Sequence, residues 1–447
     1  MTGAEPPTAR SPAESVAALT ASLDDIDRVA EPLAWAAAAY RLGMATAEQP
    51  TAQPEVALRE ALGLYEQAAQ VLSERRAPVE HARILNAAGS AHRLLGDHAT
   101  ATALFERSIG LLTGRGAEAE EASVLSNLGL VLAEQGRVDD AIATFERALT
   151  ALLGDTDAVR RTRLATMHNL AQAHMRRGSA DGFRSAVDVL EAASAVARDV
   201  DASIHTGMID HSLGVAHKAL ASADPSTDGH LDAAIEAFRR SLTVFTSVGF
   251  PMHHAIAKHN LGHALAGRDD LDSMRRALAA YDDALMIFDP RLHQAHWREA
   301  HRNAETIEAR LRALEPGASR TDHIAALAAS MDDAERLTFV RQRLLPLESL
   351  PAVHRDERLL GYCRAMVHQP PRSFVANLRT FMMVLMELPE SMLGSALRAQ
   401  LAAHAELEPH ERRAADFVLD DVVQELLFGP QRIRVRDILE EIGWDRP

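Results

Sequence analysis

Cysteine is almost absent from this sequence of 447 residues. Cys363 is the only one, which excludes a disulfide within the chain and a zinc site built from several thiolates. Because Cys363 falls inside a predicted helix, we interpret it as a buried and unreactive thiol.

Positive charge is also in short supply. Lysine and arginine together number 47 against 63 aspartates and glutamates, which gives a formal net charge of −16. A chain of this charge has little general affinity for the phosphates of nucleic acids or for an anionic membrane surface. We therefore expect no nucleic acid and no membrane among its partners.

Long apolar runs are missing as well. The best candidate, residues 381–388, is far too short to span a bilayer. Residues 1–12 lack the charged and then apolar pattern of a secretion signal. These absences predict a cytoplasmic protein.

The sequence contains no familiar catalytic motif. It has no P-loop, no G-x-G-x-x-G after a strand and no G-x-S-x-G. Its paired acids, such as Asp282 and Asp283, are adjacent in sequence and so do not face each other on a helix. We expect no enzyme activity and no cofactor.

Alanine and leucine supply most of the apolar residues. Apolar residues make up 47% of the chain and aromatic residues only 4%. Alanine permits close approach of helices and loses no side-chain entropy on folding. This composition is typical of an all-α protein.

A three-residue signature recurs six times. It consists of an alanine, an aromatic residue or leucine four positions later, and a small residue after three more. These offsets place all three residues on one side of a helix, where the small residues admit a neighbouring helix. The six sets are Ala61/Tyr65/Ala68, Ala101/Phe105/Ser108, Ala141/Phe145/Ala148, Ala186/Leu190/Ala193, Ala234/Phe238/Ser241 and Ala277/Tyr281/Ala284.

Glycines precede the signature at matching positions. Gly89 and Gly129 stand 40 residues apart, as do Gly96 and Gly136. We expect the first pair of glycines to let one helix press against the next. We expect the second pair to adopt the left-handed conformation where the chain reverses between helices. Together, the signature and the glycines predict a series of helical hairpins.

This pattern resembles the tetratricopeptide repeat family, whose loose motif is W-x2-L-G-x2-Y followed by A-x3-F-x2-A. The resemblance covers roughly residues 21–315, and repeats two and three agree best. The spacing of 40–48 residues exceeds the usual 34 and is similar to the longer-helix branch of kinesin light chains and bacterial peptide-pheromone receptors. The resemblance implies a right-handed superhelical solenoid of about six helix pairs. Another class of helical solenoid is the alternative.

The chain divides into three expected parts. Residues 1–20 form a flexible segment, and residues 21–315 form the solenoid, which ends in a capping helix at 295–314. The Pro316-Gly317 pair breaks that helix. Residues 321–447 lack the signature. We expect them to form a smaller all-helical domain of unknown family, with its first helix at 331–345.

The resemblance further implies a concave groove lined by the first helix of each pair. With the packing glycine counted as position eight, positions 2, 5, 6, 9, 12 and 13 point into it. An asparagine at position 6 can pair with any peptide unit, because its carboxamide both donates and accepts; bonding within its own repeat is the alternative. The candidate groove residues are Asn127, His168, Asn169, Gln172, Arg176, His211, Ser212, Lys218, His259, Asn260 and His263.

The histidines raise the question of a metal. His259 and His263 have the spacing of a two-histidine ligand set on one helix. Successive repeats, however, lie about a helix diameter apart, roughly 10 Å, so His168, His211 and His259 should not converge on one ion. We predict no metal site.

The function we expect is that of an adaptor or peptide-responsive regulator that binds an extended polypeptide in the groove. The histidines, Arg176 and Lys218 would favour an acidic ligand or a free C-terminal carboxylate. One alternative is a structural scaffold that organises an enzyme assembly, and another is a histidine- or metal-dependent enzyme.

Overall fold

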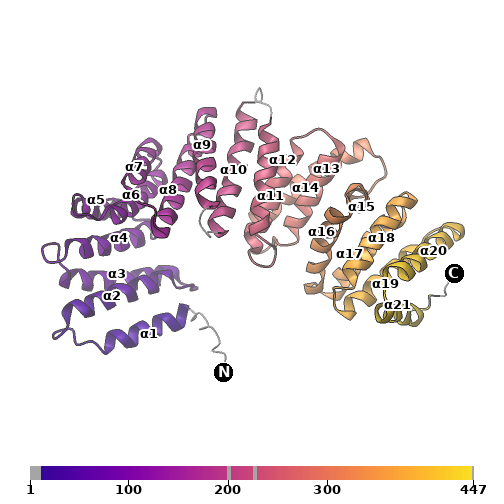
Figure 1. Cartoon of the computed structure of the whole chain (residues 1–447), viewed down its shortest axis with the longest axis horizontal. Helices are drawn as coiled ribbons and strands as arrows, with labels where there is room; N and C mark the ends of the chain where they lie inside the picture. The colour runs from indigo at the N-terminus through magenta and orange to yellow at the C-terminus, as the bar shows by residue number, and fades with distance from the viewer. Residues whose placement is uncertain (1–11, 199–202, 225–228, 445–447) are drawn as a thin grey trace. The chain divides into compact units, whose positions relative to one another are not determined.

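The computed structural model describes residues 12–198, 203–224 and 229–444. The regular structure of these residues is entirely helical, with no strand, which confirms the all-α prediction (Figure 1). No helix in the described ranges is both long and apolar enough to cross a membrane.

The chain separates into two compact units, Met1–His230 and Leu231–Pro447. This division differs from the boundary expected near residues 315–321, which stays a prediction. Part of the segment expected to be flexible is helical, because the first helix begins at Pro12. Residues 1–11 lie outside the described residues.

The N-terminal unit is a succession of antiparallel helices. After α1 (Pro12–Asp24) come four pairs, in each of which the second helix packs along the first, and then one further first helix. The helices are α2 (Pro32–Glu48), α3 (Pro54–Val71), α4 (Pro78–Leu94), α5 (His98–Leu112), α6 (Glu118–Glu134), α7 (Val138–Ala151), α8 (Asp157–Arg176), α9 (Ala180–Arg198) and α10 (Ser203–Ala223).

The recurrent signature forms the contact between paired helices. Its members are buried in all six sets. A Cβ atom added to Gly129 would lie 2.6 Å from the ring of Phe145, and one added to Gly89 would lie 2.7 Å from that of Phe105. Only glycine permits this approach, and so the first helix rests directly on the aromatic ring of the second.

The turns within the pairs follow the predicted chemistry. Gly96 and Gly136 have φ of 81° and 79°, the left-handed conformation that glycine adopts without strain. After Gly96, the side chain of Asp97 accepts a hydrogen bond from the backbone N–H of Thr100 and caps α5. The left-handed glycine, and in α5 the aspartate cap, thus determine where the second helix of the pair begins.

The first helices form the inner side of the N-terminal unit. Successive first helices touch one another, from α2 to α4, α6, α8 and α10. Among the described residues of this unit, successive second helices have no contact of similar extent. In a curved row of helix pairs, the helices that approach most closely lie on the concave side. The first helices therefore line the concave face of this unit.

The C-terminal unit begins with the end of the repeat series. Its helices are α11 (His230–Val244), α12 (Pro251–Ala266), α13 (Leu271–Leu285), α14 (Gln294–Leu314), α15 (Arg320–Ser330), α16 (Asp333–Leu344), α17 (Ala352–Val367), α18 (Pro371–Leu385), α19 (Glu390–Ala405), α20 (Pro409–Leu426) and α21 (Gly429–Glu441), with a short 3₁₀ helix, η1 (Leu345–Ser349). Helix α14 lies where a helix was expected at 295–314, and its apolar residues Ala300, Ala304, Ile307 and Leu311 are buried; its role as a cap stays a prediction.

The helices after α14 continue within the same unit. Helix α15, which the sequence did not predict, packs against α13, and α16 begins at Asp333 and not at residue 331. Beyond that point α15, α17, α19 and α21 form one row of contacts, while α16, α18 and α20 form a second. Residues of both rows share one apolar core, in which Phe381 and Leu419 are fully buried.

Candidate functional site

A row of polar side chains runs along the first helices of the N-terminal unit. The Nδ2 group of Asn127 on α6 donates to Oδ1 of Asn86 on α4 at 2.9 Å, and it lies 3.4 Å from Oγ of Ser90. Asn127 is half-buried. Among the described residues, the hydrogen bonds of Asn127 use this amide group, so its carbonyl oxygen is left for another donor.

The row continues on α8. The Nδ2 group of Asn169 lies 3.5 Å from Oγ of Ser126, at the limit of a hydrogen bond, and Thr166 approaches the same hydroxyl at 3.4 Å. This long contact is the one hydrogen bond of Asn169 in the described chain. Asn169 is half-buried, so most of its bonding capacity is unused.

The next step joins α8 to α10. Nε2 of His168 lies 2.8 Å from Oγ of Ser212, and the amide of Gln172 donates to the same hydroxyl at 3.3 Å. Burial lowers the pKa of His168, and the nearby His205 lowers it further. His168 is therefore a neutral hydrogen-bonding group near pH 7 and does not supply the positive charge expected of it.

The remaining predicted groove residues of this unit lie close by. Arg176 is exposed, but its guanidinium donates to the carbonyl of Ala133 at 2.8 Å and so links α8 to the end of α6. His211 and Lys218 on α10 are half-buried. The preference for an acidic ligand stays a prediction.

In the C-terminal unit, the predicted residues gather on α12. His259 is buried, while Asn260 and His263 are half-buried. The Nδ2 group of Asn303 on α14 lies 3.1 Å from Nε2 of His259 and 3.0 Å from Nε2 of His263. The structure thus arranges the sequence-predicted residues in two sets, one in each unit.

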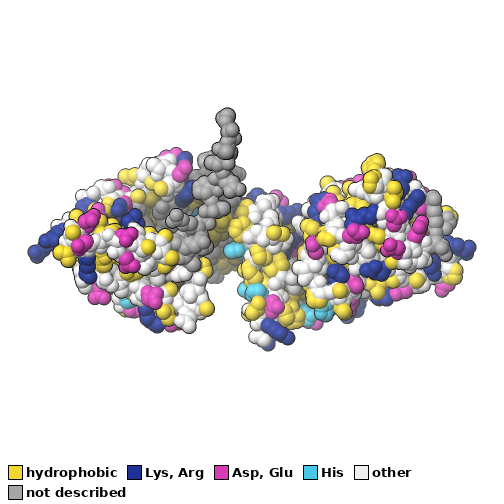
Figure 2. All heavy atoms as spheres, turned by 90° about the horizontal axis from the view of Figure 1, so that it is seen from below, with side chains coloured by type: hydrophobic (Ala, Val, Ile, Leu, Met, Phe, Trp, Pro, Cys, Tyr) yellow, Lys and Arg dark blue, Asp and Glu magenta, His cyan; other side chains and the backbone are white. Residues whose placement is uncertain are grey.

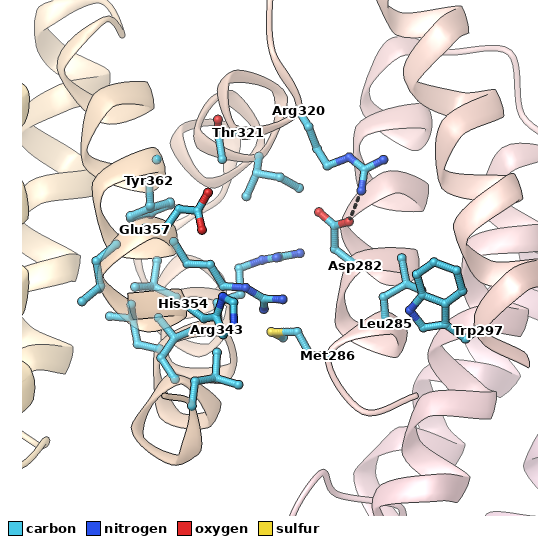
Figure 3. Close-up of a pocket in the computed structure, with 18 residues that line it drawn as sticks. Asp282, Leu285, Met286, Trp297, Arg320, Thr321, Arg343, His354, Glu357 and Tyr362 are labelled. Atoms are coloured by element: carbon cyan, nitrogen blue, oxygen red, sulfur yellow. Dashed lines mark hydrogen bonds and ion pairs between the residues drawn. The ribbon is translucent and has the colours of Figure 1, made fainter. Parts of the chain in front are cut away.

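A cavity in the C-terminal unit was not predicted from the sequence. It has a volume of about 780 Å³ and lies between α13 and α14 on one side and α15, α16 and α17 on the other (Figure 3). Leu285, Met286 and Trp297 face it from the repeat side, and Tyr362 faces it from α17. Because its walls come from helices far apart in sequence, no local motif marks it.

Charged groups surround this cavity. Arg320 donates to Asp282 at 3.1 Å, the ion pair drawn in Figure 3. Burial raises the pKa of Asp282, while Arg343 and Arg320 act in the opposite direction. Arg358 also lines the wall. An apolar pocket edged by guanidinium groups can accommodate a small ligand with an apolar body and an anionic group.

Charges of both signs are mixed over the surface. Figure 2 shows basic and acidic side chains interspersed across the visible face, with apolar atoms between them. Many of them are paired between neighbouring helices, as in Arg83 with Glu120 and Arg93 with Glu134. The net negative charge is not gathered into one patch on this face.

Comparison with known proteins identifies the repeat. The tetratricopeptide repeat family model matches residues 124–159, which hold most of α6, all of α7 and the start of α8. A comparison with curated protein sequences finds no match.

Several solved helical-repeat structures are similar to this chain. A Rap protein complexed with Competence and Sporulation Factor is 14% identical, covers 84% of this chain and 92% of its own, and has a TM-score of 0.44. The nearly identical TPR-like repeats of a Podosopora anserina protein described as a kinesin light chain are 17% identical over 48% of this chain and 96% of their own, with a TM-score of 0.37. YrrB, a TPR protein with an unusual peptide-binding site, is 18% identical over 54% and 97%, with a TM-score of 0.35.

The matched segment has the same internal packing as the pair of helices that precedes it. In α4 and α5, as in α6 and α7, a helix-packing glycine meets an aromatic ring and a left-handed glycine forms the turn. The pair of α6 and α7 thus matches the tetratricopeptide repeat model, and the pair of α4 and α5 shares its packing.

Proposed function

We propose that the protein binds an extended polypeptide along the first helices α4, α6, α8 and α10 of its N-terminal unit, and that it acts as an adaptor or a peptide-responsive regulator and not as an enzyme. Asn127 and Asn169 supply the main contacts to the backbone of the bound chain. The proposal covers one unit of the molecule, so it requires no particular arrangement of the two.

The observation that carries this proposal is the unused bonding capacity of Asn169. A half-buried carboxamide with one long hydrogen bond is poorly satisfied by its own fold. It lies on the concave side, in line with Asn127, where a passing peptide unit can both donate and accept. Each such bond contributes only about 1 kcal/mol, so affinity requires several in register.

The neutral state of His168 refines the proposal. Since burial keeps this imidazole uncharged near neutral pH, His168, Gln172 and Ser212 form a neutral polar network. Such a network recognises the peptide backbone and not the charge of its side chains. Any preference for acidic sequences then comes from the cationic side chain of Lys218.

A peptide selected from a random display library against the full chain provides the probe for the test. Its affinity is measured by fluorescence anisotropy for the wild type and for Asn127→Ala and Asn169→Ala, with Thr150→Ala on the outer helix α7 as the control. We expect each asparagine variant to weaken binding by about 1–2 kcal/mol, or roughly 5- to 30-fold, with an unchanged melting temperature. The control should bind as the wild type does.

The opposite pattern would reject the proposal. If Asn169→Ala binds the peptide fully but melts several degrees earlier, the asparagines serve the fold alone. A scaffold that holds other proteins through its outer helices and its ends would then be the better account.

A further inference from the structure

We propose that His259, His263 and Glu299 form a binding site for one divalent transition-metal ion, with Zn²⁺ as the best-suited ion. The site lies between α12 and α14 in the C-terminal unit. It goes beyond peptide binding and does not depend on it. It also reverses the expectation from sequence that these histidines hold no metal.

The three side chains converge. One candidate ligand atom from each of His259, His263 and Glu299 lies within 4.8 Å of the other two. Ligands of a tetrahedral Zn²⁺ are about 3.3 Å apart, since Zn–N and Zn–O bonds are about 2.0–2.2 Å. Glu299 is exposed, so rotation of its side chain can close the remaining distance.

Asn303 shows where the histidine lone pairs meet. Its Nδ2 group lies 3.1 Å from Nε2 of His259 and 3.0 Å from Nε2 of His263. An amide NH₂ has two hydrogens, so it can donate one to each ring. With both rings in the Nδ1–H tautomer, the two Nε2 lone pairs point at this one amide group, and that point is where a cation would be held.

The packing around the rings holds them in this orientation. The ring of Tyr281 on α13 lies 5.6 Å from that of His259 and 6.0 Å from that of His263, measured between centroids. His259 is buried, while Glu299 faces solvent, so an ion has a path to the site. Two imidazoles and one carboxylate suit Zn²⁺, and three protein ligands leave a further position for water.

The chain contains an internal counterpart that lacks two of the three metal ligands. His168, Gln172 and Ser212 repeat the offsets of His259, His263 and Asn303, four and 44 residues after the first histidine. In that set a glutamine replaces the second histidine, and the residue corresponding to Glu299 is Met208. Equivalent positions of two repeats therefore carry a polar cluster, one around His168 and one around His259. Only the cluster around His259 contains three metal-ligating side chains.

The test uses the full chain without an affinity tag, stripped of metal by a chelator and titrated with ZnCl₂ in a calorimeter. We expect one strong site per chain. Bound Co²⁺ should show a visible absorption band that indicates a coordination site of reduced symmetry. His263→Gln copies the counterpart cluster and should weaken Zn²⁺ binding at least about tenfold, as should Glu299→Gln. The metal-free melting temperature of each variant checks that it folds.

Two further variants separate a ligand set from a structural cluster. His168→Gln, in the counterpart, should leave Zn²⁺ binding unchanged. Asn303→Asp should strengthen it several-fold, because it removes the competing amide donor and adds a carboxylate beside both rings. The proposal is overturned if the wild type binds no Zn²⁺, or if it binds several ions weakly and His263→Gln makes no difference. Weaker binding in Asn303→Asp would likewise contradict a cation held between the two rings.

Discussion

Substitution by alanine should have opposite effects on stability at two kinds of glycine in the repeats. Gly129 rests on the ring of Phe145, so Gly129→Ala forces the helices apart and should lower the free energy of unfolding by about 1–3 kcal/mol. Gly110 lies within α5, and a Cβ there meets nothing within 4 Å. Gly110→Ala should therefore raise stability by up to about 1 kcal/mol, because alanine favours the helix. Urea unfolding of both variants checks this, and a stable Gly129→Ala would contradict the assigned packing.

A buried ion cluster in the C-terminal unit gives a second prediction. Asp283 bonds Lys258 at 2.8 Å and lies 3.1 Å from Arg343. Burial acts to raise the pKa of Asp283, but Arg343 and Lys258 outweigh it and the pKa is lowered. Asp283→Asn leaves two cations without their partner and should cost about 3–5 kcal/mol. Asp269→Asn, at an exposed carboxylate, should change thermal unfolding by less than about 0.5 kcal/mol.

Sequence pattern predicted individual side chains well only where their role is local. Ala141 and Phe145 are buried together because offsets along one helix place them on one side, which the sequence displays directly. The partner of Asp283 on α16 lies 60 residues away, and no spacing rule connects the two. His168 was expected to carry charge, but its burial depends on neighbouring helices that the pattern does not specify.

Helices in this fold are tied to one another at their C-terminal ends. His81 on α4 lies 2.6 Å from the carbonyl of Leu72 at the end of α3, and His254 on α12 lies 2.8 Å from that of Phe245 after α11. In each case an imidazole N–H satisfies a carbonyl that the preceding helix leaves open. The following first helix is thereby fixed against the preceding second helix.

This arrangement makes stability depend on pH. Burial lowers the pKa of His254, and the positive charge of Lys258 lowers it further. The hydrogen bond to the carbonyl of Phe245 acts in the opposite direction but does not cancel these two effects. The unfolded chain takes up a proton near pH 6.5, while the folded chain does so only at lower pH. The stability contributed by the neutral ring is thus present above about pH 6.5 and lost as the pH falls towards the folded pKa.

Denaturant unfolding at pH 7.5 and 5.5 measures this dependence. The wild type should lose stability at the lower pH, and His254→Gln should lose less. His410→Gln, at an exposed histidine, should behave as the wild type does. An equal loss in wild type and His254→Gln would exclude this residue as a cause of the dependence.

Helix boundaries were predictable where an apolar stripe is followed by a helix-breaking pair of residues. A helix was expected at 295–314 and occurs as Gln294–Leu314. Helix α15 was missed because it is short, with only 11 residues, is rich in alanine and lies outside the repeat signature. Its start is marked by a capping box of Ser319 and Asp322, a signal that the sequence does contain.

For the chain as a whole, the boundary at residues 315–321 remains a proposal about where the repeats end. Pro316 and Gly317 are exposed, so a protease should cut there. Ion pairs nevertheless cross this boundary, including Arg320 with Asp282 and Arg276 with Glu335. We expect limited proteolysis to produce two fragments that elute together from a sizing column in native buffer. Separate elution of a folded fragment 1–315 would show that the two parts fold independently.

The series of repeats was visible in the sequence, while the binding features were only partly so. Periodic alanines and glycines predict the helix pairs, and the resemblance to a known family predicts which helices face inward. The cavity beside Asp282 and Trp297 arises only where α13 and α14 meet the later helices, for which the sequence offers no pattern. The convergence of His263 with Glu299 likewise depends on how α12 meets α14.

Peptide binding along the first helices of the N-terminal unit can be tested by one cross-linking measurement. A photo-reactive amino acid replaces either Ala165 on the first helix α8 or Ala143 on the second helix α7; both alanines are exposed. Illumination with the library-selected peptide should yield a cross-linked product at Ala165 and little at Ala143. Equal yields, or a product formed only at Ala143, would contradict binding along the first helices.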